Sequence, residues 1–256
     1  MAKHIEDEVV YHYDLYPTRE DLMGETSVHA RLVRYLVEVL TWLFQGQACA
    51  MHENLNFYQT RDAEEYPLAP DIAVIKGVED IDVPSWKVGR TGPAPQVVFE
   101  IASKETWTTD QAHKPVRYAR MGVQEYFAYD PNEPLLDREA TSRLTGWQFD
   151  AAGQYMQKMP LRQNGGLWSV HLDSFLVPAG KYLYLSDRQG RLRLTQAQAE
   201  AQRAEQEARR ADAEAKAREA EARRAEAEKR RADAEAKRAE VLAEKLRSLG
   251  IDPNQL

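Results

Sequence analysis

Apolar residues near the start of the chain recur at the three- and four-residue spacing of an amphipathic helix. The positions that share this spacing are Val28, Leu32, Val33, Leu36, Leu40, Leu43 and Phe44. Thr26 or Ser27 is a suitable N-cap, and Gly46 is a suitable stop. The pattern therefore predicts a helix from about residue 27 to about residue 45.

Short apolar runs between turn-forming residues follow this helix and are typical of strands. They lie at about 48–58, 71–76, 96–102 and 124–130, and a second helix is predicted just before Gly122. Between residues 143 and 194 the pattern indicates antiparallel hairpins, with one turn at Arg188–Gly190. The order as far as Asp130 is helix, three strands, helix, strand, so we expect a mixed α/β fold.

The chain changes character after about residue 194. From Gln196 to Arg247 it is mostly Ala, Glu, Arg and Lys without Gly or Pro, which predicts one long helix that ends near Gly250. We therefore expect a domain over 1–195, a charged Ala-rich helix over 196–249 and a short tail over 250–256.

Alanine recurs along this helix at alternating four- and three-residue spacing, which is the seam of a coiled coil. One interpretation is a homo-oligomer, held most strongly by the apolar residues from Val241 to Leu249. The alternative is a solvated single helix with ion pairs such as Glu205–Arg209, because alanine buries little area.

Charge is unevenly divided between these parts. The chain carries a formal net charge of −7, and acidic and basic residues balance after residue 195, so the first domain holds the whole excess. This argues against a broad basic surface for nucleic acid. Cys49 is the single cysteine, which excludes an internal disulfide and a Cys-rich zinc site. Since no apolar run is long enough to span a membrane and the start lacks a signal-peptide pattern, we expect a cytoplasmic protein without a membrane partner.

Glu100 stands in the most apolar predicted strand, between Phe99 and Ile101. A buried carboxylate is costly unless it is paired, protonated or bound to a metal. Asp71 lies at the head of the preceding predicted strand. If the two strands pair, both carboxylates converge on one sheet edge, where two oxygen ligands suit Mg²⁺. The plainer alternatives are a Lys or Arg partner for Glu100 and a strand-end role for Asp71.

Several short stretches in this region carry a resemblance to a known family. They are Pro70–Asp71, Phe99–Ser103, the trio Asp110, Lys114 and Tyr118, Gly122–Pro131, and the closing Leu246–Pro253. Together they resemble the Uma-type restriction endonuclease family within the PD-(D/E)XK nuclease superfamily. The resemblance covers roughly residues 25–131 and implies a restriction-endonuclease-like core of helix, three strands, helix and strand, with extra hairpins and the long helix added.

The resemblance implies catalytic roles for Asp71, Glu100 and Lys114. The superfamily's usual lysine stands two residues after the second acid, where this chain has Ala102. In the narrower family the lysine comes from the following helix, which indicates Lys114, with Lys104 as the backup. Because Pro115 disfavours helix at the residue before it, the alignment of Lys114 with Asp110 stays open.

Further residues are candidates for supporting roles. Asp110 and Tyr118 lie four residues on either side of Lys114 and share its face if the segment is helical. Tyr118 and Ser103 also have plainer explanations, as a packing residue with a hydrogen-bonded hydroxyl and as a strand-end residue that bonds local backbone.

The first helix and the helix before Gly122 supply the remaining candidates. The resemblance implies that an acid on the first helix supports the metal site, which points to Glu25, with His29 one turn later. The plainer alternative is that Glu25 is a capping carboxylate and His29 a half-buried histidine. Arg117 and Arg120 extend a small basic strip that would contact phosphates.

Two hypotheses from different classes follow. The first is a DNA endonuclease that depends on Mg²⁺, or on Mn²⁺ as a substitute, with the metal held by Asp71 and Glu100 and water activated by Lys114. The second is an inactive nuclease-fold scaffold whose coiled coil is the working part. The acidic domain and Ala102 favour the second, and the retained pair of carboxylates favours the first.

Overall fold

The computed structural model describes residues 26–59, 66–103, 107–149, 156–162 and 165–250. The chain divides into two compact units, Met1–Gln196 and Ala197–Leu256. The first unit is a mixed α/β fold built on a six-stranded sheet, and the second contains the long C-terminal helix. None of the helices in the described ranges is long and apolar enough to cross a lipid bilayer.

The six-stranded sheet has the order β1-β3-β5-β6-β7-β8. Its strands are β1 Cys49–His52, β3 Ile72–Lys76, β5 Val97–Ile101, β6 Glu125–Tyr129, β7 Leu144–Phe149 and β8 Met156–Lys158. β5 and β6 are parallel, and every other neighbouring pair is antiparallel. Each residue of the two central strands is buried, as expected for strands that are covered on both faces.

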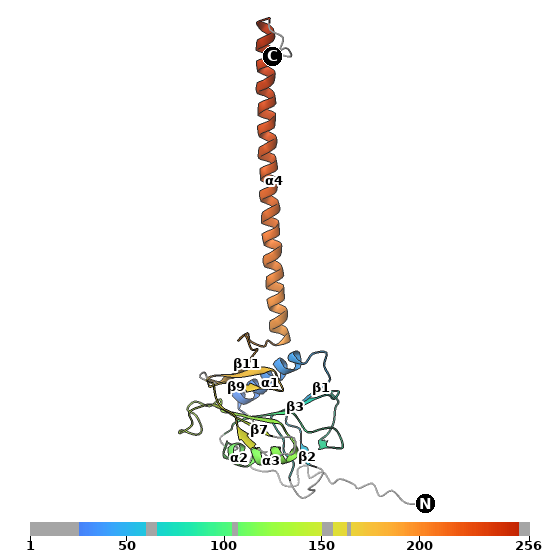
Figure 1. Ribbon diagram of the computed structural model, residues 1–256, viewed down its shortest axis with the longest axis vertical. Helices are drawn as coiled ribbons and strands as arrows, with labels where there is room; N and C mark the ends of the chain where they lie inside the picture. The colour runs from blue at the N-terminus through green and yellow to red at the C-terminus, as the bar shows by residue number, and fades with distance from the viewer. Residues whose placement is uncertain (1–25, 60–65, 104–106, 150–155, 163–164, 251–256) are drawn as a thin grey trace, which may run out of the picture. The chain divides into compact units, whose positions relative to one another are not determined.

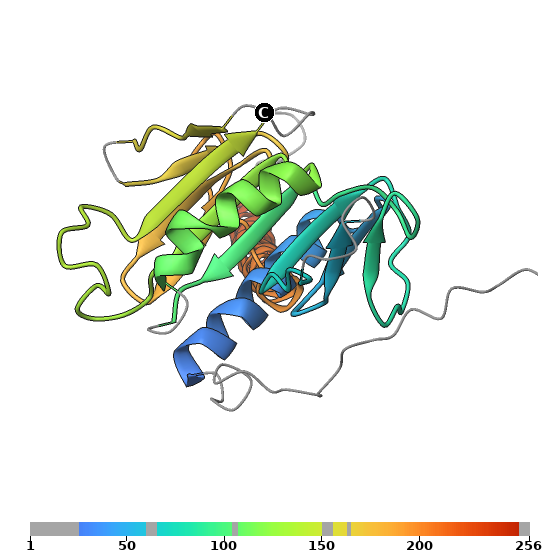
Figure 2. The same ribbon diagram turned by 90° about the horizontal axis from the view of Figure 1, so that it is seen from below.

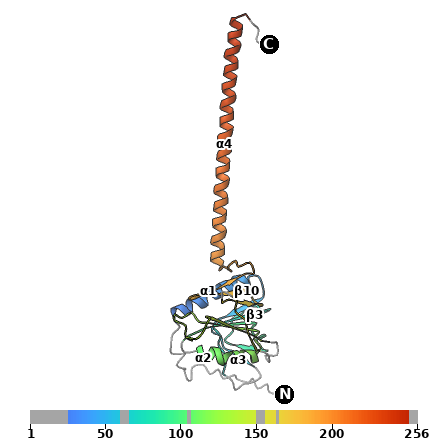
Figure 3. The ribbon, with the colours of Figure 1, turned by 60° about the vertical axis from the view of Figure 1, so that its left-hand side comes forward.

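Two apolar clusters cover the opposite faces of this sheet. One cluster joins the sheet to helix α1 (Ser27–Leu43) and to a second sheet. The other joins it to helix α3 (Lys114–Met121), which follows the short helix α2 (Trp107–Ala112). Figures 1 and 3 show α1 on one side of the sheet and α2 with α3 on the other. Along β5, Val97, Phe99 and Ile101 face α1, so Val98 and Glu100 face α3.

Helix α1 is close to its prediction. Thr26 is the N-cap, and its Oγ1 accepts a hydrogen bond from the His29 amide at 3.3 Å. The helix ends at Leu43, two residues before the predicted end, and Gly46 follows with a φ of 79°.

The predicted strand at 48–58 is wrong as one element. The chain breaks at Asn54, which has a φ of 49°, and forms β1 and a separate strand β2 (Phe57–Gln59). β2 leaves the main sheet and pairs in parallel with β4 (Trp86–Val88). The sequence pattern missed β4, because three residues inside a Pro- and Gly-rich loop give no periodicity.

The predicted helix before Gly122 is two helices. α2 ends at Ala112, α3 begins at Lys114, and Pro115 lies in the first turn of α3, where a missing N–H costs nothing. Gly122 ends α3 in the left-handed conformation with a φ of 95°. Figure 2 shows both helices lying along the strands of the sheet.

The hairpins predicted after residue 143 are present and fall into two sheets. β7 and β8 widen the main sheet, while β9 (Leu167–Ser169), β10 (Ser174–Ala179) and β11 (Tyr182–Ser186) form an antiparallel sheet of their own. The predicted turn at Arg188–Gly190 connects β11 to Leu192, which bridges back to Ser186.

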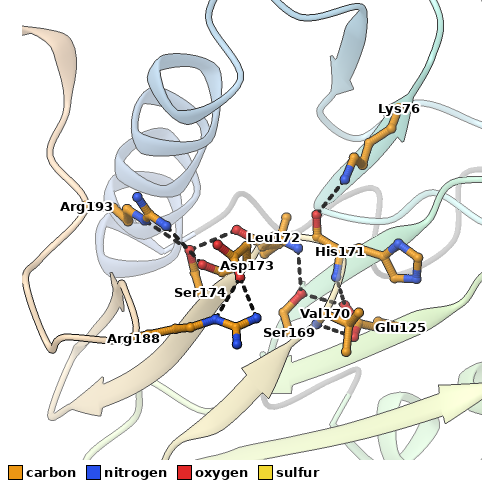
Figure 4. A network of polar contacts seen from close by, with 10 residues as sticks. All are labelled: Lys76, Glu125, Ser169, Val170, His171, Leu172, Asp173, Ser174, Arg188 and Arg193. Carbon is orange, nitrogen blue, oxygen red and sulfur yellow. Dashed lines mark hydrogen bonds and ion pairs between the residues drawn. The ribbon is translucent and has the colours of Figure 1, made fainter.

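Glu125 ties this second sheet to the first. It is fully buried at the start of β6 and accepts hydrogen bonds from the Ser169 hydroxyl and from the amides of Val170 at 2.8 Å and His171 at 3.4 Å. Lys76 of β3 donates to the His171 carbonyl at 2.9 Å (Figure 4). The turn between β9 and β10 is thus held by charged side chains from two strands of the main sheet.

Helix α4 (Gln196–Ser248) is continuous over 53 residues and has no buried side chain. The predicted ion pair between Glu205 and Arg209 is confirmed at 2.5 Å. Equivalent pairs recur at intervals of seven residues along the helix: Asp212–Lys216, Glu219–Arg223 and Glu226–Arg230. In each pair the acid precedes the base by four residues, the orientation that stabilises an isolated helix.

The alanine seam of α4 lies between two acidic stripes. Taking Ala201 and Ala204 as positions a and d, position e is acidic in six successive heptads, from Glu205 to Glu240. Position g is glutamate in five successive heptads, from Glu207 to Glu235. Positions e and g are the ones that face a partner across a coiled-coil seam, so two copies joined at this seam would bring like charges together.

Candidate active site

The strands that carry Asp71 and Glu100 are paired, which was the condition for their carboxylates to converge. β3 and β5 are antiparallel with Ile72 opposite Phe99, and Asp71 directly precedes β3. The Ile101 amide donates to Asp71 Oδ2 at 2.5 Å, which fixes the Asp71 carboxylate against β5. The two carboxylates therefore come from adjacent strands and meet at the end of β5.

His29 joins this pair from the first turn of α1. Its Nε2 lies 3.2 Å from Asp71 Oδ1, and both side chains are almost buried. Glu25, the acid proposed with it, lies outside the described residues. The structure thus places His29 against one candidate metal ligand.

Glu100 is 3% exposed and is bonded to two side chains of α3. The Tyr118 hydroxyl donates to Glu100 Oε1 at 2.6 Å, and Lys114 Nζ lies 2.9 Å from Glu100 Oε2. Lys114 and Tyr118 are one turn apart, so both reach the sheet from the same helix face. The partner that a buried carboxylate requires is therefore present within the protein.

Asp110 completes the cluster from α2. Lys114 Nζ lies 2.8 Å from Asp110 Oδ1, so the break between α2 and α3 does not separate the two side chains. The backbone carbonyl of Asp110 accepts a hydrogen bond from the Tyr126 hydroxyl of β6 at 2.9 Å. Tyr126 also packs against Tyr118, with ring centroids 5.1 Å apart. Tyr118 thus has the packing role, with a hydrogen-bonded hydroxyl, that was its plainer explanation, and Tyr126 has the same kind of contacts.

Burial and charge shift the titration of this cluster. The pKa of Glu100 is raised to about 8, with burial as the largest cause; Asp71 and Asp110 also raise it, while the Lys114 ammonium and the Tyr118 hydrogen bond lower it. Burial lowers the pKa of Lys114, but the carboxylates of Glu100 and Asp110 outweigh burial and raise it above its ordinary value. Burial, followed by Glu100, raises the pKa of Tyr118 well above 10. At neutral pH Lys114 is an ammonium and Tyr118 is a hydrogen-bond donor.

The remaining candidates are Lys104, Ser103, Arg117 and Arg120. Lys104, the backup lysine, lies outside the described residues. Ser103 follows β5, and its carbonyl accepts the amide of Trp107 at 3.1 Å. Arg120 lies in the last turn of α3, where its carbonyl accepts from Gln59, so it is at the far end of the helix from Lys114.

Two further observations concern Arg117 and Ala102. The Arg117 guanidinium donates to the carbonyl of Tyr66. Ala102, at the position of the superfamily's usual lysine, is 3% exposed and directly follows β5. An ammonium from α3 therefore reaches Glu100 where the strand itself supplies none.

The donor set fits a hard divalent cation. Asp71 and Glu100 offer carboxylate oxygens, and a cation there would offset the cost of burying Glu100. Within the described ranges, no three His, Cys, Asp or Glu side chains are close enough together to hold one ion. Two carboxylates are ligands that suit Mg²⁺, which binds through one or two carboxylates and keeps several waters.

Comparison with known proteins finds a family model that matches the region of this cluster. The family model Uma2, described as "Putative restriction endonuclease", matches residues 18–140. The match covers just under half of the chain. The matched region contains every candidate residue named above, whereas β7 to β11 and α4 lie beyond it. The sequence-based resemblance is confirmed.

One solved structure and the curated proteins complete the comparison. A crystal structure of "a putative nuclease belonging to DUF820" from Anabaena variabilis ATCC 29413 is 14% identical, with a TM-score of 0.41. The similarity covers 59% of this chain and 76% of that chain. No curated protein matches this chain.

Proposed function

We propose that the region matched by the Uma2 model is a metal-dependent DNA endonuclease with a restriction-endonuclease-like core. The observation that carries this proposal is the meeting of Asp71 and Glu100 on adjacent strands, with the Lys114 ammonium 2.9 Å from Glu100. The family description supports a nuclease. Two carboxylates that hold a metal and a cationic donor are groups that can catalyse phosphodiester hydrolysis.

Asp71 and Glu100 would hold Mg²⁺, or Mn²⁺ in its place, with the Ile101 carbonyl as a further oxygen. A bound cation would polarise the scissile phosphate and lower the pKa of a coordinated water. The raised pKa of Lys114 makes it a poor general base at neutral pH. We assign it instead to orienting the attacking water and stabilising the negative charge that develops on the phosphate.

His29 and Tyr118 would position the two carboxylates. His29 contacts the Asp71 oxygen that does not bond to Ile101, and Tyr118 contacts the Glu100 oxygen opposite Lys114. Each contact fixes the rotation of one carboxylate. Such support from neighbouring side chains is the usual way in which metal ligands are oriented.

Cleavage of supercoiled plasmid DNA tests this function. Wild type should nick or cut with Mg²⁺ or Mn²⁺ and stop in EDTA, and Glu100→Gln should lose the activity. Glu139→Gln is the matched control, because Glu139 is an exposed acid of the same domain. Metal-dependent cutting by Glu100→Gln at the wild-type rate would refute the assignment.

A scaffold function is the second candidate, and one observation favours it. Glu100 already has Lys114 and Tyr118 as partners, so its burial does not require a metal. Wild type that binds neither Mg²⁺ nor Mn²⁺ in calorimetry and does not cut DNA would establish this alternative.

A homo-oligomer built on α4 stays a prediction, as does a cytoplasmic location. The acidic stripes on both sides of the alanine seam count against self-pairing at neutral pH, because either helix orientation brings acid against acid. The regular ion pairs within α4 support the alternative of a single solvated helix.

A further inference from the structure

We infer that Asp110 is a positioning residue that retains Lys114 beside the phosphate site when a divalent cation takes over Glu100. The inference rests on the proposed function and adds to it a role for a carboxylate outside the metal pair. Nothing in the family description assigns this role.

The geometry that carries the inference is a shared ammonium. Lys114 Nζ lies 2.9 Å from Glu100 Oε2 and 2.8 Å from Asp110 Oδ1, so the two acids hold it equally closely. Both acids are buried, with exposed fractions of 3% for Glu100 and 0% for Asp110, and the Lys114 side chain is 18% exposed. If one of the two carboxylates were lost, little water could reach the Lys114 ammonium to take its place.

A cation bound to Glu100 would compete with Lys114 for the same carboxylate. The cation and the Lys114 ammonium would repel each other, because both are positive and both contact Glu100. A buried ammonium left without a carboxylate partner is also destabilised by its loss of hydration. Asp110 removes most of that penalty, because it remains bonded to Lys114 when Glu100 turns to the cation. Asp110 therefore makes the exchange of partners at Glu100 possible while Lys114 stays in place.

The position of Asp110 fits this role better than that of a third metal ligand. Across the described segments no three potential ligands are close enough to share an ion. Asp110 stands on α2, where the Tyr126 hydroxyl fixes its backbone carbonyl at 2.9 Å. The anchor of Lys114 is thus attached to the central strand β6 and is independent of the Asp71–Glu100 pair.

Binding of Mn²⁺ to the full-length chain tests the inference without any measurement of cleavage. Titration by electron paramagnetic resonance or calorimetry compares wild type, Asp110→Asn, Lys114→Met and the double variant. Asp110→Asn should weaken binding about tenfold, since displaced Lys114 then lacks a carboxylate. Lys114→Met should bind Mn²⁺ at least as tightly as wild type. In the Lys114→Met background the Asp110 substitution should have no effect.

The outcomes separate this inference from the proposed function. Equal weakening by Asp110→Asn in both backgrounds, or no weakening in either, overturns the role of Asp110 while the metal site stands. A wild-type chain that binds no Mn²⁺ overturns the metal site and the inference with it. Circular dichroism and tryptophan fluorescence check the fold of each variant.

A second variant keeps the test decisive if Asp110→Asn does not fold. Tyr126→Phe removes the hydroxyl that fixes the Asp110 backbone and leaves every charge in place. It should weaken Mn²⁺ binding about twofold to threefold in wild type and leave binding unchanged in Lys114→Met. An equal effect in the two backgrounds would contradict the inference.

Discussion

Replacing Glu100 by glutamine should change how stability depends on pH. Glutamine keeps the size of the side chain and its ability to accept from Tyr118, but it has no proton to release. In the folded chain the pKa of Glu100 is raised from 4.5 to about 8 by burial. The substitution therefore isolates the cost of an ionised carboxylate inside the strand.

The size and sign of the effect follow from proton linkage. In the metal-free protein, a Glu100 pKa of about 8 means that between pH 4.5 and 8 the folded chain holds a proton on Glu100 that the unfolded chain has released; ionisation above that range, or a bound cation, leaves the carboxylate that pairs with Lys114. The free energy of unfolding of wild type should therefore fall as pH rises, by about 1.4 kcal/mol per pH unit from this group alone. Glu100→Gln lacks this contribution, so its stability relative to wild type should increase steadily from pH 5 to pH 8.

Urea unfolding in EDTA, followed by tryptophan fluorescence, measures this difference. All five tryptophans precede α4, so the signal reports on the first unit alone. The difference between variant and wild type cancels the other titrating groups, and Glu139→Gln should give a flat difference. A constant difference between Glu100→Gln and wild type across this range would refute the argument that burial keeps Glu100 protonated.

Three further predictions concern the rest of the chain. Gly146→Ala should destabilise the first unit by about 1–3 kcal/mol in the same assay, because a Cβ there would lie 2.6 Å from Leu167 Cδ1. Glu125→Ala should cost about 3 kcal/mol or more, since the Ser169 hydroxyl and two amides lose their buried acceptor. Sedimentation at neutral pH should find no association of the chain through α4. Association should appear near pH 4, where the acidic stripes of α4 lose charge. Dimers that form through α4 at neutral pH and low salt would contradict the charge argument.

The elements that the sequence predicted well are those with a strong period or a clear stop. α1 shows both, with Thr26 at its start and Gly46 beyond its end. The apolar pattern did not reveal the break at Asn54, where φ is positive and the amide donates to the carbonyl of Pro70 across the fold. Local propensity cannot report a contact that is made across the fold.

The candidate site was predictable to the extent that strand pairing determined it. Asp71 and Glu100 meet because their strands are neighbours, and a carboxylate within an apolar strand is a visible signal. The double contact of Lys114 was not visible, since Pro115 left the course of the helix open. Glu125 carried the same signal as Glu100 at the start of the next strand, and its role in holding the second sheet was missed.

The seven-residue repeat of α4 means that the length of the helix can change in regular steps. At about 1.5 Å per residue its 53 residues span about 80 Å. Removing one heptad would shorten it by about 10 Å while turning whatever follows by only about 20°. Because each of the four successive repeats from Glu205 to Arg230 contains its own ion pair, one of these repeats can be added or lost with little effect on the stability of the others. Length is therefore the property of this helix that whole-repeat insertions and deletions can adjust most freely.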